Sequence, residues 1–458
     1  MQRLFAIIWL TWKAAFRFKL FWVVGVLLLV TVVGLPLVIK HDGTARGFTQ
    51  ILLTYTLGMI TTLLGLITLW VACGTLARDV EECQIQMVAV KPISRWQIWL
   101  GKWLGIMLVN LVLLAVAGGS VYVLLKWRAA RLDAKERKIL QDEIFVARGS
   151  LREEAVDIHP DVERLFQERL KRVGPGEVDL KLLRQQVTEQ VQAEYQIVRP
   201  GQPRRWRINL GLLKDSLRDQ PLFIRTKFNA AQTNSSGTYR AIWQIGPPET
   251  GKVQEREMSL AADTFHEFPI PPNLYDEKGV LTIDFINFND TALLFSLNDG
   301  LEVLYRESGF GLNFVRGLGI VLCWLAVLAA LGLTAATFLS FPVAAFLALG
   351  ILVLGLSTGT MQTAVSEGTI LGWDAKAEGP TQSWLNALFL PVFKVILKVF
   401  NLMQGFSPID SLSTGRSITW GQLGLAFAEN VLLLGGLIGL IGICIFQRRE
   451  LATAQGTV

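Results

Sequence analysis

The sequence predicts a polytopic α-helical membrane protein with six spans and a large extracytoplasmic α+β insert. Hydrophobic residues make up 51% of the 458 residues, mean hydropathy is +0.41 and only 18% are charged, whereas soluble chains carry about 25% charged residues. The apolar residues form long runs near both ends of the chain. The polar centre between them is long enough for one or two small domains with their own cores.

Six apolar runs are each long enough to cross a bilayer, because about 20 residues of helix extend roughly 30 Å. They lie at Leu20–Ile39, Ile51–Ala77, Trp103–Leu125, Asn313–Phe338, Phe341–Gln362 and Leu423–Phe446. A backbone inside hydrocarbon must satisfy its own hydrogen bonds, so each run is expected to be helical. The first run is too long for a signal-peptide core and has no small-residue cleavage site after it, so we interpret it as a span.

The segment before the first span, Met1–Lys19, predicts an amphipathic helix. Leu4, Ile8, Trp12 and Phe16 form one apolar stripe, and basic residues occupy other positions of the segment. Such a helix lies on an anionic membrane leaflet. The alternative is that the segment only extends the first span.

Lys and Arg residues near the span ends predict which side of the membrane each end faces. They gather in the N-terminal segment, between the second and third spans, and at the C-terminus. With six spans these three places share one side, which marks the cytoplasm. The insert after the third span then lies outside, although Lys126, Arg128 and Arg131 at its start oppose the charge rule. Long translocated domains cross regardless of such charges.

The insert, residues 126–311, divides into two parts. Residues 126–203 predict a helical segment, in which Asp179–Tyr195 carries apolar residues at helical spacing. These are Leu182, Leu183, Val187 and Val191. Residues 204–311 instead alternate apolar and polar residues around Trp206, Trp243 and Phe285, and Phe223 alternates with Arg225. Short strands of this kind, separated by Gly, Pro and Asn turns, predict an antiparallel β-sandwich.

The fifth and sixth spans are separated by an external helical element, amphipathic or re-entrant, predicted at Trp384–Gly405. Lys394 and Lys398 lie one turn apart in it, and Pro408 follows it. Trp residues near the predicted membrane surface fit an interfacial belt. Residues 1–125 would thus hold the N-terminal helix and spans one to three, and residues 312–458 would hold spans four to six with this element near 384–405.

Two pairs of glycines four residues apart, Gly355 with Gly359 and Gly435 with Gly439, lie in the fifth and sixth spans. Small residues at this spacing let two helices approach closely. The pattern fits either a face between two subunits or packing inside one subunit.

Several kinds of chemistry find no support in the sequence. Basic and acidic residues alternate through the centre, which does not favour nucleic-acid binding. The three histidines are far apart, and the four cysteines form no CxxC pair. Gly246–Lys252 matches most of a phosphate-binding loop, but Val253 replaces the Ser or Thr that binds magnesium, so we interpret it as a turn between strands. We therefore expect no catalytic residue, no metal and no cofactor.

The most specific signal lies between the second and third spans. Arg78-Asp79-Val80-Glu81-Glu82 is followed by Lys91-Pro92-Ile93-Ser94-Arg95 and then by Leu100-Gly101-Lys102. A charged segment leaves one span, turns at Pro92 and re-enters the membrane. This arrangement resembles the permease subunits of ABC transporters of the type-2 exporter family, as does the ending Phe446-Gln447-Arg448-Arg449-Glu450. Cys83-Gln84 stands where that family commonly has Gly-Thr, and the resemblance does not cover the insert.

The resemblance implies a transmembrane permease subunit of an ATP-driven exporter in the cytoplasmic (inner) membrane. Such a subunit works as a homodimer or with a related permease subunit, and ATP hydrolysis takes place on separate ABC ATPase subunits. The residues expected to couple to the ATPase are Glu81, Glu82, Lys91, Pro92, Ser94, Arg95 and Lys102. The insert would bind an extracytoplasmic partner or a glycan. Two alternatives are a non-transporting transmitter of ATPase-driven motion to an outside partner, and a membrane-anchored binding or sensor protein without an ATPase.

Overall fold

The computed structural model describes residues 2–17, 19–38, 44–82, 93–154, 156–173, 180–232, 234, 236–248, 251, 253–297, 299–370, 373–374, 379–380, 384–404 and 407–449. The chain divides into two compact units. Met1–Ala147 and Ser308–Val458 form the membrane unit, and Arg148–Glu307 form the insert unit. The insert unit thus begins about twenty residues later than the sequence pattern predicts, since helix α6 (Ala134–Glu143) belongs to the membrane unit.

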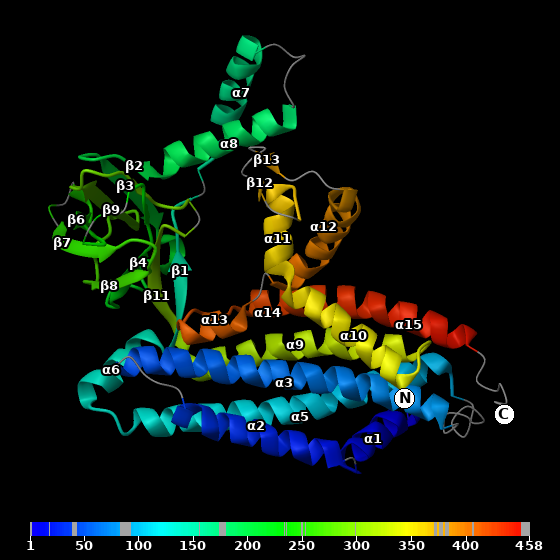
Figure 1. Ribbon diagram of the computed structural model, residues 1–458. Coiled ribbons are helices and arrows are strands. Elements are labelled where there is room, and N and C mark those ends of the chain that lie inside the picture. The colour runs from blue at the N-terminus through cyan, green and yellow to red at the C-terminus, as the bar shows by residue number, and fades with distance from the viewer. Residues whose placement is uncertain are drawn as a thin grey trace. The chain divides into compact units, whose positions relative to one another are not determined.

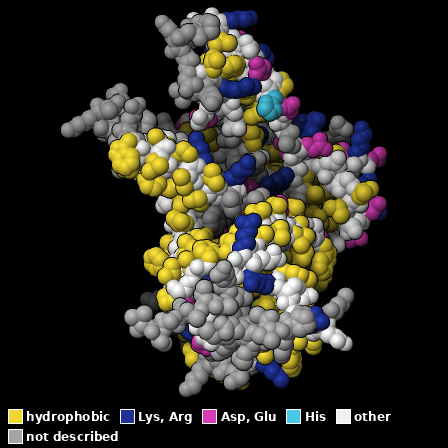
Figure 2. Space-filling model, turned by 90° about the vertical axis from the view of Figure 1, so that its right-hand side faces the viewer, with side chains coloured by type: hydrophobic (Ala, Val, Ile, Leu, Met, Phe, Trp, Pro, Cys, Tyr) yellow, Lys and Arg dark blue, Asp and Glu magenta, His cyan; other side chains and the backbone are white. Residues whose placement is uncertain are grey.

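Four helices of the described residues are long and apolar enough to cross a membrane, which makes the chain a membrane-embedded protein. They are α3 (Ala45–Glu81), α5 (Arg95–Ala129), α9 (Phe310–Ala336) and the run from α14 (Trp420–Ala426) to α15 (Gly436–Arg448). Helices α3, α5 and α9 lie alongside one another (Figure 1). Large hydrophobic side chains such as Phe346 and Leu432 are exposed, and Figure 2 shows broad hydrophobic areas with few charges among them. Hydrophobic surfaces of this extent are expected to face lipid and not water.

The first and fifth predicted spans differ from simple spanning helices. Helix α2 (Lys19–Val38) covers the first run, but its described apolar stretch, Gly25–Leu35, is shorter than a span. The fifth run forms α10 (Phe341–Leu356) and α11 (Thr358–Glu367), which are bent by 54° at Ser357. The described residues therefore contain four spanning helices, or five if the bent pair counts as one span, and a six-span topology remains a prediction.

The last span contains a π-helical segment, η3 (Phe427–Gly435), between α14 and α15. Asn430 is fully buried there, and within the described part of the chain its side-chain amide has no hydrogen-bond partner. π-helical turns are rare and occur frequently at functional sites. The uniform helix predicted for Leu423–Phe446 is thus interrupted.

Helix α1 (Gln2–Arg17) packs along α5 on two glycines. A Cβ at Gly101 would lie 2.8 Å from Ile7, and one at Gly105 would lie 2.6 Å from Thr11. Ile7 and Thr11 are buried, while Leu4, Ile8 and Trp12 of the predicted stripe are half-buried. The helix predicted from the sequence is therefore present, and its inner face contacts another helix.

One of the four paired glycines also packs within the subunit. A Cβ at Gly439 would lie 2.8 Å from the Trp99 ring of α5, and Gly442 one turn later lies against Thr334 of α9. The contact at Gly439 therefore supports packing inside one subunit. A Cβ at Gly359 would meet nothing within 4 Å.

The rest of the membrane unit connects these helices. Helix α12 (Trp384–Gln404) matches the helical element predicted at Trp384–Gly405 and packs against α11, and its external position remains a prediction. It is followed by α13 (Pro408–Ser413), whose Leu412 contacts α9 at Gly317. Strands β12 (Trp373–Asp374) and β13 (Gly379–Pro380) form a small antiparallel pair.

The insert unit contains two four-stranded sheets, as the alternating pattern predicts. The first has the order β1 (Val146–Leu151), β11 (Leu301–Gly309), β4 (Leu222–Thr226) and β8 (His266–Ile270). The second has the order β3 (Pro203–Asn209), β9 (Val280–Asn287), β6 (Thr238–Ile245) and β7 (Gln254–Ala261). A smaller sheet joins β2 (Ile197–Val198), β10 (Leu293–Leu294) and β5 (Asn229–Ala230), and a short helix η1 (Gly211–Leu213) follows β3. Strand β1 lies in the range predicted to be helical.

Both large sheets contribute to one hydrophobic core. Trp206, Trp243 and Phe285 of the second sheet are almost fully buried, and they share a cluster with Ile224 and Val303 of the first. The Trp243 and Phe285 rings lie 4.8 Å apart, edge to face, which is the favoured geometry for aromatic pairs. The alternation in the sequence therefore places the inward-facing residues correctly on the second sheet.

The other face of the first sheet carries a row of buried charges. Arg225 of β4 lies opposite Glu302 of β11, with 3.6 Å between Nη1 and Oε1, and opposite Glu267 of β8. Arg148 of β1 forms an ion pair with Glu267, and the side chains of both are less than a tenth exposed. Charges buried in this way must be paired. Phe223 and Arg225 thus share the charged face, and the core residues of β4 are Leu222 and Ile224.

Helices α7 (His159–Val173) and α8 (Leu180–Gln196) form a hairpin with a small core of its own. The core residues are Val162, Phe166, Leu183, Val187 and Val191. Three of them are the residues whose spacing predicts the helix at Asp179–Tyr195, and that prediction is confirmed. The side chain of Leu182 lies outside the described residues.

We expect residues 148–307 to fold when expressed alone, because both faces of the core come from this unit. Circular dichroism should show a β-rich spectrum with cooperative thermal unfolding, and Trp243→Ala should lower the free energy of unfolding by roughly 3–5 kcal/mol. A fragment of residues 204–308 lacks β1 and Arg148 and should be less stable. Equal stability of the two fragments would contradict a structural role for β1.

We expect Gly105→Val to displace α1 from α5, because its Cβ would overlap Thr11. Gly119→Val on the same helix is the matched control, since a Cβ there meets nothing within 4 Å. In detergent, Gly105→Val should lower the melting temperature and make α1 accessible to protease, whereas Gly119→Val should do neither. Identical behaviour of the two variants would show that α1 does not pack on this glycine pair.

Candidate functional site

The predicted coupling residues lie where α3 ends and α5 begins. Glu81 is the last residue of α3 and Glu82 caps it, while Ser94 and Arg95 begin α5. The Ser94 backbone N–H donates to Gln97 Oε1 at 3.3 Å, which satisfies one of the amides left free at a helix start. Lys91 and Pro92 belong to residues 83–92, outside the described residues. The two ends of that segment therefore define the site.

Lys102 and Asp79 join α5 to α3 by a partly buried ion pair. Lys102 Nζ lies 2.6 Å from Asp79 Oδ2 and also donates to the Thr75 carbonyl at 2.8 Å. The Lys102 side chain is 10% exposed and that of Asp79 is 33% exposed. An ammonium group inside an apolar helix bundle requires such partners, because its desolvation is costly.

Arg95 caps the C-terminal end of the last helix. Its Nη1 donates to the carbonyls of Phe446, Gln447 and Arg449 at 2.7–2.8 Å. These carbonyls lie at the end of α15, where intrahelical partners run out and where a cation is favoured by the helix dipole. Arg449 in turn donates from Nη1 to the Thr337 carbonyl at 2.6 Å, at the end of α9. One guanidinium therefore joins α5 to α15, and the next joins α15 to α9.

Three further contacts tie α3 to α10. Glu81 Oε1 accepts a hydrogen bond of 2.9 Å from the backbone N–H of Phe341, the first residue of α10. The Arg78 guanidinium lies 4.6 Å from the centroid of the Phe341 ring, and the Trp70 ring packs edge-on against the same ring at 5.0 Å. A carboxylate at a helix N-terminus is favourable for the same reason as a cation at a C-terminus.

These contacts form one connected group at the ends of five helices, which we call the helix-end clamp. It consists of Arg78, Asp79, Glu81, Arg95, Lys102 and Arg449. Three of the predicted coupling residues, Glu81, Arg95 and Lys102, thus contact other helices of the same chain. Their contact with an ATPase remains a prediction, as it does for Glu82, Lys91, Pro92 and Ser94.

Asp79 and Arg449 lie within the sequence motifs, but the sequence alone assigns no partner to either side chain. For Asp79 a signal was present, since Lys102 interrupts an apolar run and an interior lysine needs an acid within reach. No comparable signal exists for Arg449, because its acceptor is a backbone carbonyl more than one hundred residues away. The identity of a side chain does not by itself predict a bond of this kind.

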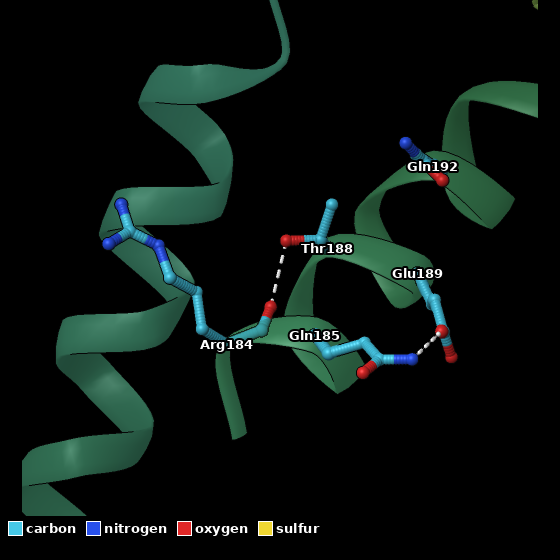
Figure 3. A pocket seen from close by; sticks show the side chains of 5 residues that line it. All are labelled: Arg184, Gln185, Thr188, Glu189 and Gln192. Atoms are coloured by element: carbon cyan, nitrogen blue, oxygen red, sulfur yellow. Dashed lines mark hydrogen bonds between the residues drawn. The ribbon is translucent and has the colours of Figure 1, made fainter. Parts of the chain in front are cut away.

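The α7–α8 hairpin of the insert unit presents a second polar surface. Arg184, Gln185, Thr188, Glu189 and Gln192 line a shallow depression on α8 (Figure 3). Two of the bonds there stay within the helix, from Thr188 to the Arg184 carbonyl and from Gln185 to Glu189. The Tyr195 hydroxyl of α8 donates a hydrogen bond of 2.6 Å to Asp161 of α7, and this bond raises the pKa of Tyr195. The depression is open and carries no catalytic arrangement among the residues that line it.

Comparison with other proteins assigns no chemistry to these surfaces. No protein-family model, no curated protein and no solved structure matches the chain. The described residues also hold no group of three or more His, Cys, Asp or Glu side chains suited to a metal ion. The helix-end clamp is therefore the candidate site, because its charged residues, among them the buried Lys102, connect the ends of five helices.

We expect Lys102→Met to destabilise the membrane unit by about 2–3 kcal/mol. Removing one partner of a fully buried pair costs roughly 3–5 kcal/mol, and the effect is smaller here because Asp79 is one-third exposed. Thermal unfolding in detergent measures the change, with the exposed Lys398→Met as the control. The double variant Asp79→Asn/Lys102→Met should be closer to the original protein than Lys102→Met. If Lys102→Met unfolds like the control, the pair contributes nothing to stability.

Proposed function

We propose that this chain is the transmembrane permease subunit of an ATP-driven ABC exporter, coupling a separate ATPase to export across the cytoplasmic membrane. The observation that carries the proposal is how α3 and α5, the helices that flank residues 83–92 in the sequence, are joined to the other helices. Helix α3, which precedes this segment in the sequence, contacts α10 through Glu81, and α5, which follows it, holds α15 through Arg95. Both flanking helices are thus attached to the helix-end clamp.

Attachment at both ends gives the segment a mechanical role. A displacement of residues 83–92 acts on α3 and α5 at once, and the clamp passes it to α9, α10 and α15 through hydrogen bonds and ion pairs. Helix α5 has 35 residues, which corresponds to about 52 Å of rigid rod. Movement applied at one membrane surface by nucleotide-driven closure of two ATPases therefore reaches the other surface.

The clamp divides six of the seven coupling residues into two groups, and the seventh, Ser94, caps the start of α5. Lys91, Pro92 and the exposed Glu82 are proposed to contact the ATPase, whereas Glu81, Arg95 and Lys102 pass the movement on. The clamp's four basic residues support a cytoplasmic position for this end of the helices. In the proposed six-span topology, the insert unit lies outside, and a second copy or a related permease completes the transporter.

A specific observation favours the second candidate, a transmitter that moves an outside partner and transports nothing. A groove between α2 and α5 is lined almost entirely by apolar side chains, among them Leu29, Val116 and Val123, which does not suit a polar cargo. The insert unit has its own core, and its helical hairpin has an exposed polar face that suits a protein partner or a glycan. ATP-dependent movement of the insert without flux into vesicles would distinguish this candidate from an exporter.

We expect Lys91→Glu to weaken association with the ATPase by about tenfold or more, since a reversed charge at a complementary interface is repulsive. Lys398→Glu is the matched control, because it makes the same exchange at an exposed lysine of α12. Co-purification from mild detergent measures association, and stimulation of ATPase activity in the reconstituted complex measures coupling. Both should fall for Lys91→Glu alone and at equal thermal stability.

The same experiment tests the hypothesis of a membrane-anchored binding or sensor protein without an ATPase. If no ATPase accompanies the unaltered protein under any mild condition, the chain is a membrane-anchored binding or sensor protein. If an ATPase co-purifies equally with both variants, residues 83–92 do not form the contact.

A further inference from the structure

An open groove runs between α2 and α5 on the membrane unit. Leu29 and Val33 of α2 form one side, and Val116, Gly119, Val123 and Trp127 of α5 form the other. Its volume is about 670 Å³, within the range of roughly 300–1,000 Å³ typical of small-molecule sites. Among the described residues that line it, the single hydroxyl, on Ser120, donates to the Val116 carbonyl of its own helix at 2.8 Å. The groove therefore offers an apolar surface.

The groove is hollow because its floor has no side chain at Gly119. A Cβ at Gly119 would meet nothing within 4 Å, whereas a Cβ at the neighbouring Gly118 would lie 2.5 Å from Leu318 of α9. The two adjacent glycines therefore act differently. Gly118 lets α5 pack on α9, and Gly119, about 100° further around the helix, leaves space beside that contact.

Basic residues lie at the end of this groove. The Arg131 guanidinium stacks 3.6 Å from the centroid of the Trp127 ring, which closes the groove. Lys126 and Arg128 lie close to Arg131 in the sequence. Within the described residues, their charged groups contact only aromatic rings, with 5.6–5.8 Å from the Lys126 ammonium and 3.9 Å from the Arg128 guanidinium to the ring centroids. Within the described part of the chain, none of the three has a carboxylate partner.

The carbonyls at the end of α5 do not supply acceptors to these cations. Arg137 already donates to the carbonyls of Ala129, Ala130 and Leu132 at 2.7–3.3 Å. Arg131 is exposed, and its planar guanidinium matches the geometry of a phosphate. An anionic group held here would lie directly above an apolar groove.

We propose that this groove binds one acyl chain of an anionic phospholipid, whose phosphate is held by Arg131 with Lys126 beside it. Trp127 and the three cations are residue types that favour the headgroup level of a bilayer. From Trp127 to Ala115, the lining of α5 extends about 18 Å, which is close to half the roughly 30 Å hydrocarbon thickness. The site thus has the length of one leaflet. It requires only that α5 crosses a membrane, and in the proposed six-span topology it also accounts for three basic residues that oppose the charge rule.

The test uses the full-length protein in mild detergent with phosphatidylglycerol or phosphatidylcholine added, and native mass spectrometry to count bound lipids. The unaltered protein should retain one phosphatidylglycerol per chain, with about tenfold preference over phosphatidylcholine, as expected for one charge-assisted hydrogen-bonded contact. Gly119→Leu fills the groove and should abolish retention of that lipid. Arg131→Gln should reduce the preference to about twofold or less.

Matched controls separate a specific site from general lipid contact. Gly58→Leu fills another position where a Cβ meets nothing within 4 Å, on α3, and Arg448→Gln removes an exposed cation at the opposite end of the helices. Both should bind lipid like the unaltered protein. The proposal is overturned if Arg131→Gln keeps the full preference, or if all four variants lose lipid equally. Loss of a dimer mass in Gly119→Leu, with lipid retained, would instead assign the groove to a second copy of the chain. Arg131→Gln, at an exposed position, decides the outcome even if Gly119→Leu does not fold.

Discussion

Lys102 lies two turns inside an apolar helix, and a lysine in that position must find acceptors within its own reach. Asp79 and the Thr75 carbonyl supply them, and both lie on α3. This requirement fixes the last two turns of α3 against the first turns of α5. The remaining contacts of the clamp then follow from the same rule for backbone groups, because helix ends near a membrane surface leave carbonyls and amides that side chains must satisfy. Arg95 and Arg449 do so at the C-terminal ends, and Glu81 does so at an N-terminus.

Local sequence patterns predicted the parts of this structure that depend on local physics. The spacing of Leu183, Val187 and Val191 predicted α8, and alternation around Trp206 and Trp243 predicted strands whose inward residues form the core. Contacts between distant segments were not predictable in this way, since Arg95 and its acceptors are about 350 residues apart. The π-helical segment and the bend at Ser357 were also not predicted, because each changes the hydrogen-bonding geometry of the backbone without changing the hydrophobicity of the predicted span.

The charged face of the first sheet shows why one alternating strand was harder to interpret than the others. In β4, Leu222 and Ile224 face the core, and Phe223 and Arg225 face the opposite side. The ion pairs of Arg225 and Arg148 add little net stability, since burying charges offsets most of their attraction. They do specify register. A slip of β4 by one residue would place Arg225 in the core and separate it from Glu302, so only one pairing of β4 with its neighbours leaves the charges satisfied.

The π-helical segment of the last span has a consequence for rotation about the helix axis. Each residue of an α-helix advances the chain by about 100°, and a π-helix, with its wider turn, advances it by less. Phe427–Gly435 therefore sets the angular offset between the face of α14, where Leu423 meets Gly319, and the face of α15, where Gly439 meets Trp99. If the segment returned to α-helical geometry, α15 would turn about its own axis and Gly439 would leave Trp99. Arg95, bound to the carbonyls at the end of α15, opposes that turn. Rotation of α15 about its own axis would therefore disturb these contacts more than a change in its tilt.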